Sequence, residues 1–316
     1  MFEIRSHPVR VAIVGAGNVG STVAYALLMS GLSAEIVLID ANQSKAEGEA
    51  MDLNHAVPLT HPTKIRVGSL SDCAGAAVTV IAAGAGQKPG ESRLDLVKRN
   101  ADIFSAIVPE AAKHNPTGIL LVTTNPVDVL TYHSWKISGL PEKQVIGSGT
   151  ILDTARFRYL LSQHFDVDAR SVHAYIIGEH GDSEVPVWSL ANIAGMRLEE
   201  FCRTNGCPFD VAAMNDIFKK TRDAAYEIIK RKGATYYAVA AGIIRIVEAI
   251  LRDQRTVLTV STLIRNYNGL DDVCLSLPTV VDRGGVEGFL RLDLNESERS
   301  ALAISAQVLK RTIAGL

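Results

Sequence analysis

The chain has 316 residues, of which 47% are hydrophobic and 21% charged. This length corresponds to roughly two domains at about 150 residues each, and the globular composition excludes a disordered chain or a small disulfide-stapled scaffold. The 32 basic and 34 acidic side chains leave a net charge of −2, which argues against a nucleic-acid-binding protein. We therefore expect small molecules, or other copies of the chain, as ligands.

The sequence shows no sign of metal binding, export or membrane insertion. Of the four cysteines, only Cys202 and Cys207 are close in sequence, and no second pair completes a zinc site. Residues 1–10 lack the basic start and apolar run of a signal peptide, and no stretch of about 18 residues is apolar throughout. These features predict a soluble cytoplasmic protein with reduced thiols and no metal.

The first half of the chain alternates β-branched runs with helical patterns. The runs at residues 9–14, 36–39, 64–67, 78–83 and 119–123 predict buried strands, and the segments 21–30 and 94–114 predict helices. Alternating strands and helices indicate a parallel sheet with right-handed crossovers. We expect an α/β fold with a Rossmann-type doubly wound parallel sheet over residues 1–149.

The second half predicts an α+β domain over residues 150–316. Residues 150–164, 211–231 and 234–252 predict long helices, and residues 257–264 and 273–280 predict adjacent antiparallel strands. Asn295, with Glu298 three residues later, matches a capping box that begins a last helix ending near Ile313. Without a linker or repeat, the boundary near Gly149 should be a packed junction.

A G-x-G-x-x-G pattern at Gly15, Gly17 and Gly20 lies between a predicted strand and a predicted helix. In this context the first glycine permits a tight turn, the second lets a pyrophosphate approach the helix N-terminus, and the third allows close helix packing. Asp40 ends the next strand, where a carboxylate accepts hydrogen bonds from a ribose and repels a 2′-phosphate. The pattern predicts NAD rather than NADP; the alternative for Asp40 is capping of a turn.

Several polar residues of the second half suit catalysis. His180 lies between glycines at 178 and 181 after a predicted strand, which favours exposure to a cleft. Asp153 and Arg156 are three residues apart and share a helix face. A histidine can donate a proton near neutral pH, a carboxylate can orient it, and an arginine can bind a substrate carboxylate in bidentate fashion. Taken singly, these residues could equally form a turn and a surface ion pair.

Other polar residues follow strands or lie on a helix. Arg93 ends the polar segment 86–93 and could polarise a ketone, and Asn125 follows the fifth strand. Thr235 and Val239 are four apart and should share one helix face. Each also has a bland alternative as a surface charge, a turn residue or a helix filler. Only the joint order of these residues along the chain favours a catalytic site.

That joint order resembles the lactate/malate dehydrogenase family, and within it the bacterial enzymes, over nearly the whole chain. The resemblance rests on motifs at residues 15–20, 84–94, 124–128, 147–158 and 177–186. It implies that His180 is the proton donor and acceptor, that Asp153 is its partner and that Arg156 binds the substrate carboxylate. It also implies that Arg93, on a mobile loop at about 86–96, polarises the carbonyl. Asn125 would position the substrate and His180, Thr235 would line the pocket, and Val239 would pack by the nicotinamide.

The resemblance also implies the wider NAD site and an assembly. The cofactor residues would be Gly15, Gly17, Asn18, Val19, Gly20, Asp40, Lys45, Gly84, Ala85, Thr123, Asn125, Ser148 and Val239. The expected assembly is a homotetramer with two-fold axes, and the expected role is NAD-linked fermentation at the end of glycolysis.

Gln87 favours pyruvate and lactate over oxaloacetate and malate. Malate-type relatives place arginine there, and a second substrate carboxylate beside a neutral glutamine would be a buried charge without a partner. Malate dehydrogenase and a non-catalytic NAD-binding subunit remain the alternatives; the L configuration follows from the resemblance only.

Arg158 points to a second anion site. It lies two residues past Arg156, about 200° around a helix at roughly 100° per residue, so the two cannot serve one pocket. Relatives activated by fructose 1,6-bisphosphate resemble this chain at Arg158 and His173. Two copies across a two-fold axis would pair these cations for a bisphosphate; the alternative is a solvated arginine and a strand histidine without regulation.

Overall fold

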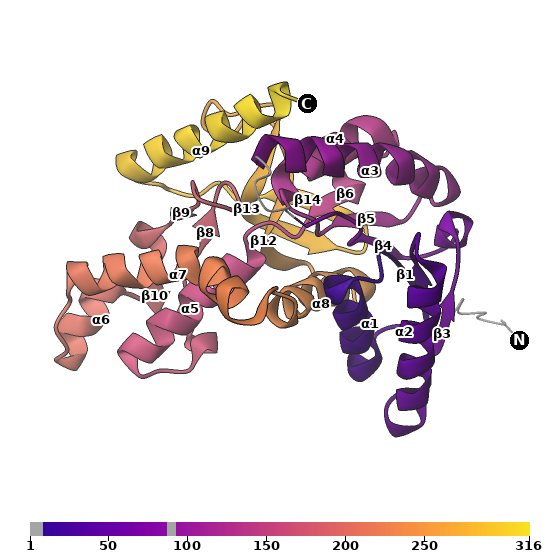
Figure 1. The fold of residues 1–316 in the computed structure, drawn as a ribbon. Helices are drawn as coiled ribbons and strands as arrows, with labels where there is room; N and C mark the ends of the chain where they lie inside the picture. The colour runs from indigo at the N-terminus through magenta and orange to yellow at the C-terminus, as the bar shows by residue number, and fades with distance from the viewer. Residues whose placement is uncertain (1–8, 87–92) are drawn as a thin grey trace, which may run out of the picture.

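The computed structural model describes residues 9–86 and 93–316, without the side chain of Arg93. Its centre is a sheet in which nine described strands follow the order β14-β13-β12-β6-β5-β4-β1-β2-β3 (Figure 1). The strands are β1 (Arg10–Val14), β2 (Glu35–Ile39), β3 (Lys64–Val67), β4 (Val78–Ile81), β5 (Ile119–Val122), β6 (Val145–Gly147), β12 (Thr256–Ile264), β13 (Val273–Asp282) and β14 (Gly285–Phe289). The first six pair in parallel, which confirms the doubly wound α/β fold.

The predicted antiparallel strands of the second half extend this same sheet. β12 pairs antiparallel with β13, as the sequence predicts, and β12 also pairs antiparallel with β6 through Ser261 and Gly147. The sheet therefore runs without interruption across the expected junction near Gly149. Because β6 pairs with β5 on one side and with β12 on the other, it is an inner strand and not a sheet edge.

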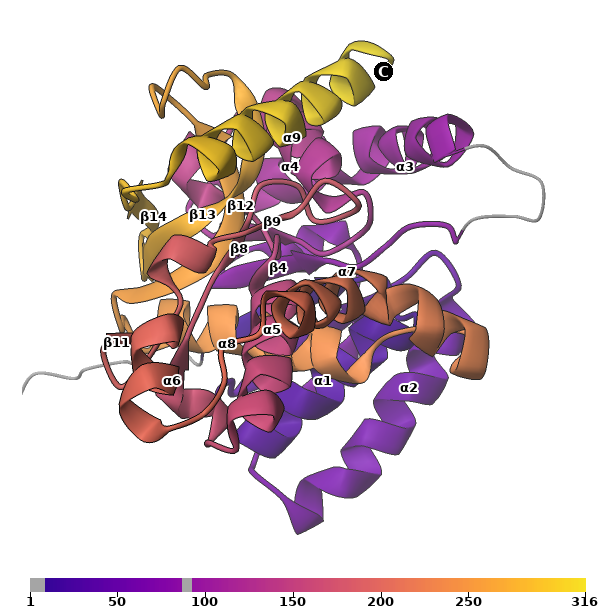
Figure 2. The same cartoon turned by 90° about the vertical axis from the view of Figure 1, so that its left-hand side faces the viewer.

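Helices cover both faces of the sheet (Figures 1 and 2). They are α1 (Asn18–Ser30), α2 (Gln43–Ala56), α3 (Arg93–His114), α4 (Val127–Ser138), α5 (Ile151–Phe165), α6 (Leu198–Asn205), α7 (Val211–Lys232), α8 (Tyr237–Leu251) and α9 (Glu296–Ala314). Short strands complete the second half: β7 (Val172–His173), β8 (Ile176–Ile177), β9 (Val185–Pro186), β10 (Asn192–Ile193) and β11 (Met196–Arg197). The capping box of the last helix forms as predicted. The Asn295 side chain accepts a hydrogen bond from the backbone N–H of Glu298, and the Glu298 side chain accepts one from the backbone N–H of Asn295.

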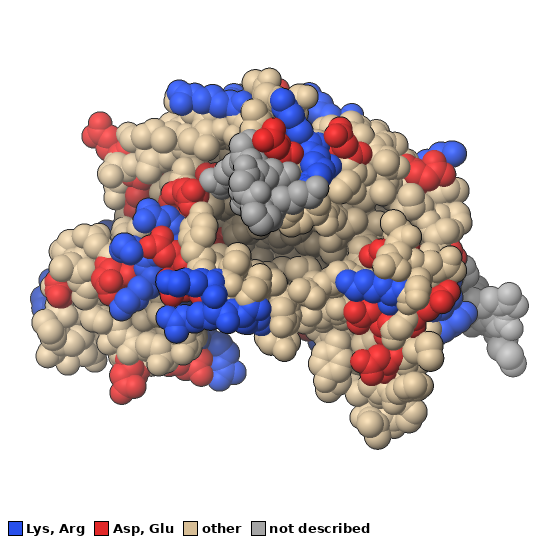
Figure 3. Space-filling view, in the orientation of Figure 1, with Lys and Arg blue, Asp and Glu red and all other residues tan. Residues whose placement is uncertain are grey.

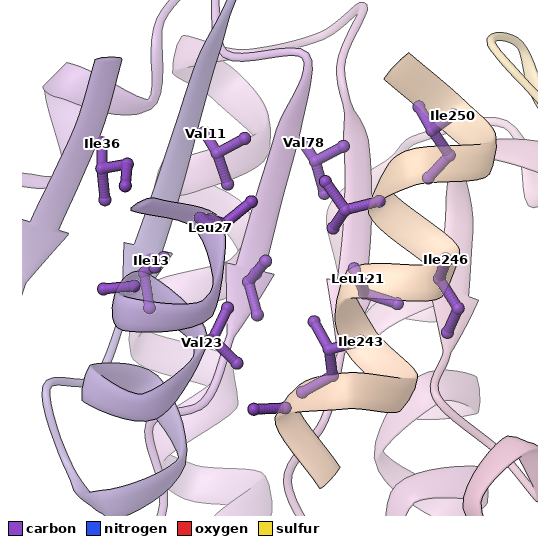
Figure 4. Packing of buried hydrophobic residues seen from close by; sticks show 14 of the residues in the cluster. Val11, Ile13, Val23, Leu27, Ile36, Val78, Leu121, Ile243, Ile246 and Ile250 are labelled. Atoms are coloured by element: carbon purple, nitrogen blue, oxygen red, sulfur yellow. The ribbon is translucent and has the colours of Figure 1, made fainter. Parts of the chain in front are cut away.

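The main core joins the two halves of the chain. Helix α8, from the second half, packs beside α1 against strands of the first half (Figure 4). Val23 and Leu27 of α1, with Ile243 and Ile246 of α8, belong to one buried cluster with strand residues such as Ile13. Burying such aliphatic side chains stabilises the fold by roughly 1.5–3 kcal/mol each. The opposite face is covered by α3 and α4 around Phe104 and Leu130.

The boundaries differ from expectation in one place that matters for the site. The sequence predicts a helix from residue 234, with Thr235 and Val239 on one face, but α8 begins only at Tyr237. Gly233, with a φ of 86°, ends α7 in the left-handed conformation, and residues 234–236 connect it to α8 without helical structure. Thr235 lies in that connection, so the expectation of a shared helix face is wrong.

No helix in the described parts of the chain combines the length and the apolar character needed to cross a bilayer. Cys73, Cys202, Cys207 and Cys274 are all free thiols.

Candidate active site

The glycine-rich turn after β1 has the form that dinucleotide binding requires. Gly15 has a φ of 106°, and a Cβ there would lie 2.4 Å from the Ala83 nitrogen, so only glycine fits. A Cβ on Gly20 would lie 1.8 Å from the Gly15 carbonyl oxygen, which explains the close helix packing. Gly17 caps α1 without a side-chain hydrogen bond, and nothing lies within 4 Å of where its Cβ would be. The helix N-terminus is therefore open to an anion such as a pyrophosphate.

Asp40 lies beside this turn at the end of β2. Its Oδ2 accepts the Ala16 N–H at 2.6 Å and its Oδ1 accepts the Asn42 N–H at 2.8 Å. The carboxylate thus caps a turn, the bland alternative from the sequence, and also lies at the glycine-rich loop where a ribose would bind. The turn cap is thus present, and binding of a ribose by the same side chain stays a prediction.

The remaining residues expected at the cofactor are distributed around the same end of the parallel strands. Gly84 and Ala85 follow β4, Thr123 and Asn125 follow β5, and Ser148 follows β6. Asn18 and Val19 form the first turn of α1, Lys45 lies in the first turn of α2, and Val239 lies in the first turn of α8. Ligands of open α/β sheets bind at this carboxyl end.

Asn100 of α3, which the sequence analysis missed, ties two of these strand ends together. Its Oδ1 accepts the Ala85 N–H at 2.8 Å and its Nδ2 donates to the Asn125 carbonyl at 3.0 Å. The side chain is 1% exposed. Because α3 carries several other polar residues, nothing local in the sequence marked Asn100 as buried.

His180 and Asp153 meet in a cavity of about 300 Å³. The cavity is lined by residues of α3, α4, α5, α7 and the β8–β9 turn: Leu96, Val97, Asn125, Pro126, Asp153, Arg156, His180, Gly181, Asp182, Glu184, Arg222, Ala225, Tyr226 and Ile229. In the space-filling view the surface is hollowed at the centre of the face shown (Figure 3). The His180 Nδ1 and Asp153 Oδ2 atoms lie 2.5 Å apart, and the two side chains are 22% and 3% exposed. The expected orientation of His180 toward a cleft is confirmed.

Arg156 completes a line of three interacting groups. Its Nη1 donates to the Asp153 Oδ1 at 3.0 Å, so Asp153 bridges the guanidinium and the imidazole. Burial opposes ionisation of Asp153, but the neighbouring His180 and Arg156 outweigh it and keep the pKa of Asp153 below its usual range. Burial likewise disfavours the imidazolium, yet Asp153 above all, then Asp128 and Glu184, raise the pKa of His180 to about 9. The imidazole therefore carries a proton at neutral pH.

Asp128 is a second residue that the sequence analysis missed. It lies in the first turn of α4, is 1% exposed, and its Oδ2 accepts the backbone N–H of His180 at 2.7 Å. Its Oδ1 is buried and has no hydrogen-bond partner within the described chain. Burial raises the pKa of Asp128 to about 6, despite favourable contacts of its ionised form with Ser261 and His180. Its place at the end of the 124–128 motif, three residues after Asn125, was the only sequence signal.

Three expected residues are not placed in this cavity. Gln87 and the side chain of Arg93 lie outside the described residues, as does most of the expected loop 86–96, of which residues 93–96 form the first turn of α3. Thr235 is not among the residues that line the cavity within the described chain.

Arg158 lies in a different cavity from Arg156, as the helix geometry predicts. The cavity that contains Arg158 is lined by residues of α5 and α8, Arg245 among them, and by Tyr175. The Nε of Arg158 donates to the Ala174 carbonyl at 2.9 Å, and the guanidinium of Arg158 lies over the Tyr175 ring, 5.3 Å from the centroid. His173 is exposed on the adjacent strand β7.

Comparison with known proteins gives consistent matches over both halves. Residues 9–147 match the family model of the lactate/malate dehydrogenase NAD binding domain, and residues 150–315 match that of the lactate/malate dehydrogenase alpha/beta C-terminal domain. The chain is 55% identical to the L-lactate dehydrogenase of Acetivibrio thermocellus, covering 96% of both chains. It is 52% identical to a probable L-lactate dehydrogenase of Schizosaccharomyces pombe, covering 96% of this chain and 92% of that one.

Solved structures agree with these sequence matches. The minor L-lactate dehydrogenase from Enterococcus mundtii, in a ligand-bound form, superposes with a TM-score of 0.94 at 41% identity and covers 98% of both chains. A lactate dehydrogenase from a deep-sea metagenome library gives the same TM-score at 44% identity, covering 97% of this chain and 98% of that one. The glycine-rich turn, the His180–Asp153–Arg156 line and these matches together place the chain in the lactate/malate dehydrogenase family, with NAD as its cofactor.

Proposed function

We propose that this chain is an L-lactate dehydrogenase, which interconverts pyruvate and L-lactate with NAD as the redox partner. The observation that supports this most is the continuous line from His180 through Asp153 to Arg156 in one cavity. It provides a proton donor and a carboxylate-binding cation in the wall of one cavity, as a small 2-oxo acid requires. The L configuration comes from the names of the relatives.

The roles of the cavity residues follow from their charges. The guanidinium of Arg156 binds the substrate carboxylate, because its planar fork can donate two hydrogen bonds. The imidazolium of His180 gives its proton to the ketone oxygen as that oxygen becomes a hydroxyl, and neutral His180 takes the proton back in the reverse direction. Asp153 keeps the ring oriented and charged. Arg93 polarises the carbonyl, and Thr235 completes the pocket.

The cofactor fits the open N-terminus of α1. The free Gly17 position and Asp40 suit the pyrophosphate and the adenosine ribose, and Val239 would lie by the nicotinamide. When bound, the reduced nicotinamide supplies the hydride for the ketone carbon. The same site includes Asn18, Val19, Lys45 and the strand-end residues described above.

The substrate is decided by one assay. The purified chain should oxidise NADH with pyruvate and much more slowly with oxaloacetate, because Gln87 offers no charge to a second carboxylate. A preference for oxaloacetate would identify a malate dehydrogenase instead. No oxidation with either substrate would identify a non-catalytic NAD-binding subunit.

We further propose a homotetramer activated by fructose 1,6-bisphosphate at Arg158 and His173. The Arg158 side chain donates to the carbonyl of Ala174, the residue that follows His173, and this proximity supports a shared site that a second copy could double. Light scattering should give four times the chain mass of 33.9 kDa. The effector should lower the apparent KM for pyruvate, and Arg158→Gln should remove that effect while leaving the unactivated rate intact. Superimposable saturation curves with and without the effector would refute the regulation.

The proposed domain boundary lies at residues 149 and 150, between the spans of the two family models. We also propose a cytoplasmic enzyme that regenerates NAD during fermentation; its four free thiols are typical of a reducing compartment.

A further inference from the structure

Glu184 is a buried carboxyl group in the wall of the active-site cavity, and the proposed reaction gives it no role. It lies in the turn between β8 and β9, four residues past His180, and only 6% of it is exposed. It lines the same cavity as Asp153, Arg156 and His180. Its Oε1 is buried without any hydrogen-bond partner among the described residues.

An ionised carboxylate is costly in such a place. A charge removed from water needs a close partner, and a buried group without one binds a proton instead. The negative charge of Asp153, from α5, further disfavours ionisation of Glu184. The opposing positive groups are His180 in the same turn, Arg156 on α5 and Arg222 on α7, whose side chain is 37% exposed and hydrogen-bonded to Asp223.

The balance favours the neutral acid. Burial, followed by the charge of Asp153, raises the pKa of Glu184 to about 9 against the effects of His180, Arg156 and Arg222. Two further polar groups at the cavity rim, Asp182 and Tyr226, are hydrogen-bonded to each other at 2.8 Å.

The protonation state of Glu184 sets the charge that the substrate meets. With Glu184 neutral, the least exposed charged side chains that line the described cavity are one anion, Asp153, and two cations, His180 and Arg156, at 3%, 22% and 13% exposure. One positive charge remains for one substrate carboxylate. An ionised Glu184 would cancel it, and a bound monocarboxylate would then place an unbalanced negative charge in a buried site. Asp128 contacts the His180 backbone from α4, but it loses its proton near pH 6, so its charge stays constant at alkaline pH.

We propose that Glu184 is a positioning residue that holds a second proton of the active site, and that pyruvate binds productively only when both His180 and Glu184 are protonated. This inference rests on the proposed reaction with pyruvate. Deprotonation of either group removes the net positive charge of the cavity, which balances the negative charge of the substrate carboxylate. The two groups interact, so their two ionisations belong to the pair rather than to one residue each.

The number of protons can be counted from the alkaline pH dependence of kcat/KM for pyruvate at saturating NADH. If two protons are required, the wild-type value falls toward 100-fold per pH unit at the alkaline end, because each proton contributes a factor of ten. Glu184→Gln keeps the shape of the side chain and its neutral charge, so its value should fall only tenfold per pH unit.

Glu179→Gln is the matched control, because Glu179 is a buried carboxyl in the same turn that binds Ser183 rather than lining the cavity. It should retain the wild-type slope. A tenfold fall per pH unit in the wild type, or equal slopes in wild type and Glu184→Gln, would overturn the proposal. Absence of pyruvate reduction by the wild type at any pH would instead refute the proposed function.

A second measurement does not depend on activity. Infrared difference spectra of the enzyme without ligands, recorded between neutral and alkaline pH, should show the carbonyl stretch of a protonated carboxylic acid disappearing. Glu184→Gln should lack this band and Glu179→Gln should keep it. A band unchanged in Glu184→Gln would show that Glu184 is ionised at neutral pH and would refute the inference even if Glu184→Gln altered the rate.

Discussion

The backbone N–H of His180 donates to the Asp128 carboxylate at 2.7 Å, although the two residues are 52 positions apart. Asp128 lies in the first turn of α4, after β5, whereas His180 follows β8. The side chain of His180 meets Asp153 while its main chain meets Asp128, so two buried carboxylates hold it from two sides. The orientation of the imidazole is thereby set jointly by both halves of the chain.

Replacing Asp128 by asparagine should change stability in a pH-dependent way. The pKa of Asp128 is raised from 3.8 to about 6, so between these values the folded state binds a proton that the unfolded state has lost. Wild-type stability therefore falls as pH rises through this window, by up to about 3 kcal/mol at 1.36 kcal/mol per unit. The amide of Asp128→Asn would keep an acceptor for the His180 N–H without the buried charge.

Urea unfolding of wild type and Asp128→Asn at pH 4.5 and pH 7.5 checks this. The stability of the variant relative to wild type should be more favourable at pH 7.5. Asp52→Asn, at an exposed position of α2, serves as the surface control. An equal difference at both pH values would contradict the assigned burial of the Asp128 charge.

Asp153→Asn should impair catalysis and shift its pH dependence. Without the neighbouring carboxylate, the pKa of His180 should fall from about 9 toward the ordinary value of 6.5. Pyruvate reduction requires the protonated ring, so the loss of rate on raising the pH should occur at lower pH than in wild type. At pH 7.5 we expect kcat/KM to decrease by roughly 10²-fold or more.

The profile of kcat/KM against pH measures this shift. Asp168→Asn, which removes an exposed ion pair with Arg170, should leave the profile unchanged. If kcat/KM of Asp153→Asn falls at the same alkaline pH as that of the wild type, Asp153 does not raise the pKa of His180.

Arg156→Lys should raise the KM for pyruvate. Lysine keeps the charge but loses the planar pair of donors, and the hydrogen bond to Asp153 must rearrange. Loss of a charge-assisted hydrogen bond of about 1.5–3 kcal/mol corresponds to roughly 10- to 150-fold in kcat/KM. Arg158→Lys, in the other cavity, is the matched control and should leave kcat/KM without effector nearly unchanged. Equal effects of both changes would place the substrate carboxylate elsewhere.

Gln87→Arg should move the substrate preference toward oxaloacetate. An arginine would supply the charge that a second carboxylate lacks in the wild type, and would be left unpaired beside the methyl group of pyruvate. The ratio of kcat/KM for the two substrates, measured in wild type and variant, checks this. Gln87→Leu is the neutral control, because it should lower activity without favouring oxaloacetate. If this ratio is unchanged in Gln87→Arg, residue 87 does not determine the choice between pyruvate and oxaloacetate.

The sequence by itself determined those features that depend on neighbours along the chain. The α/β alternation, the glycine turn at Gly15, and the capping box at Asn295 and Glu298 each follow from local periodicity or conformation, and all are confirmed. His180 could also be singled out, because adjacent glycines signal an accessible loop. The sequence predicts the start of α8 too early because the apolar helical pattern begins at residue 234, whereas α8 starts only at Tyr237, after the left-handed cap at Gly233.

Only the tertiary structure decided which polar groups share a buried environment. Nothing near Asp128, Asn100 or Glu184 in the sequence shows that they are buried, because the segments that cover them come from distant parts of the chain. Desolvation and the approach of other charges determine whether a carboxyl group is ionised, and both depend on three-dimensional distance. Residue types therefore predicted a proton donor and an anion-binding arginine, while the fold decided which carboxyl groups are buried beside them.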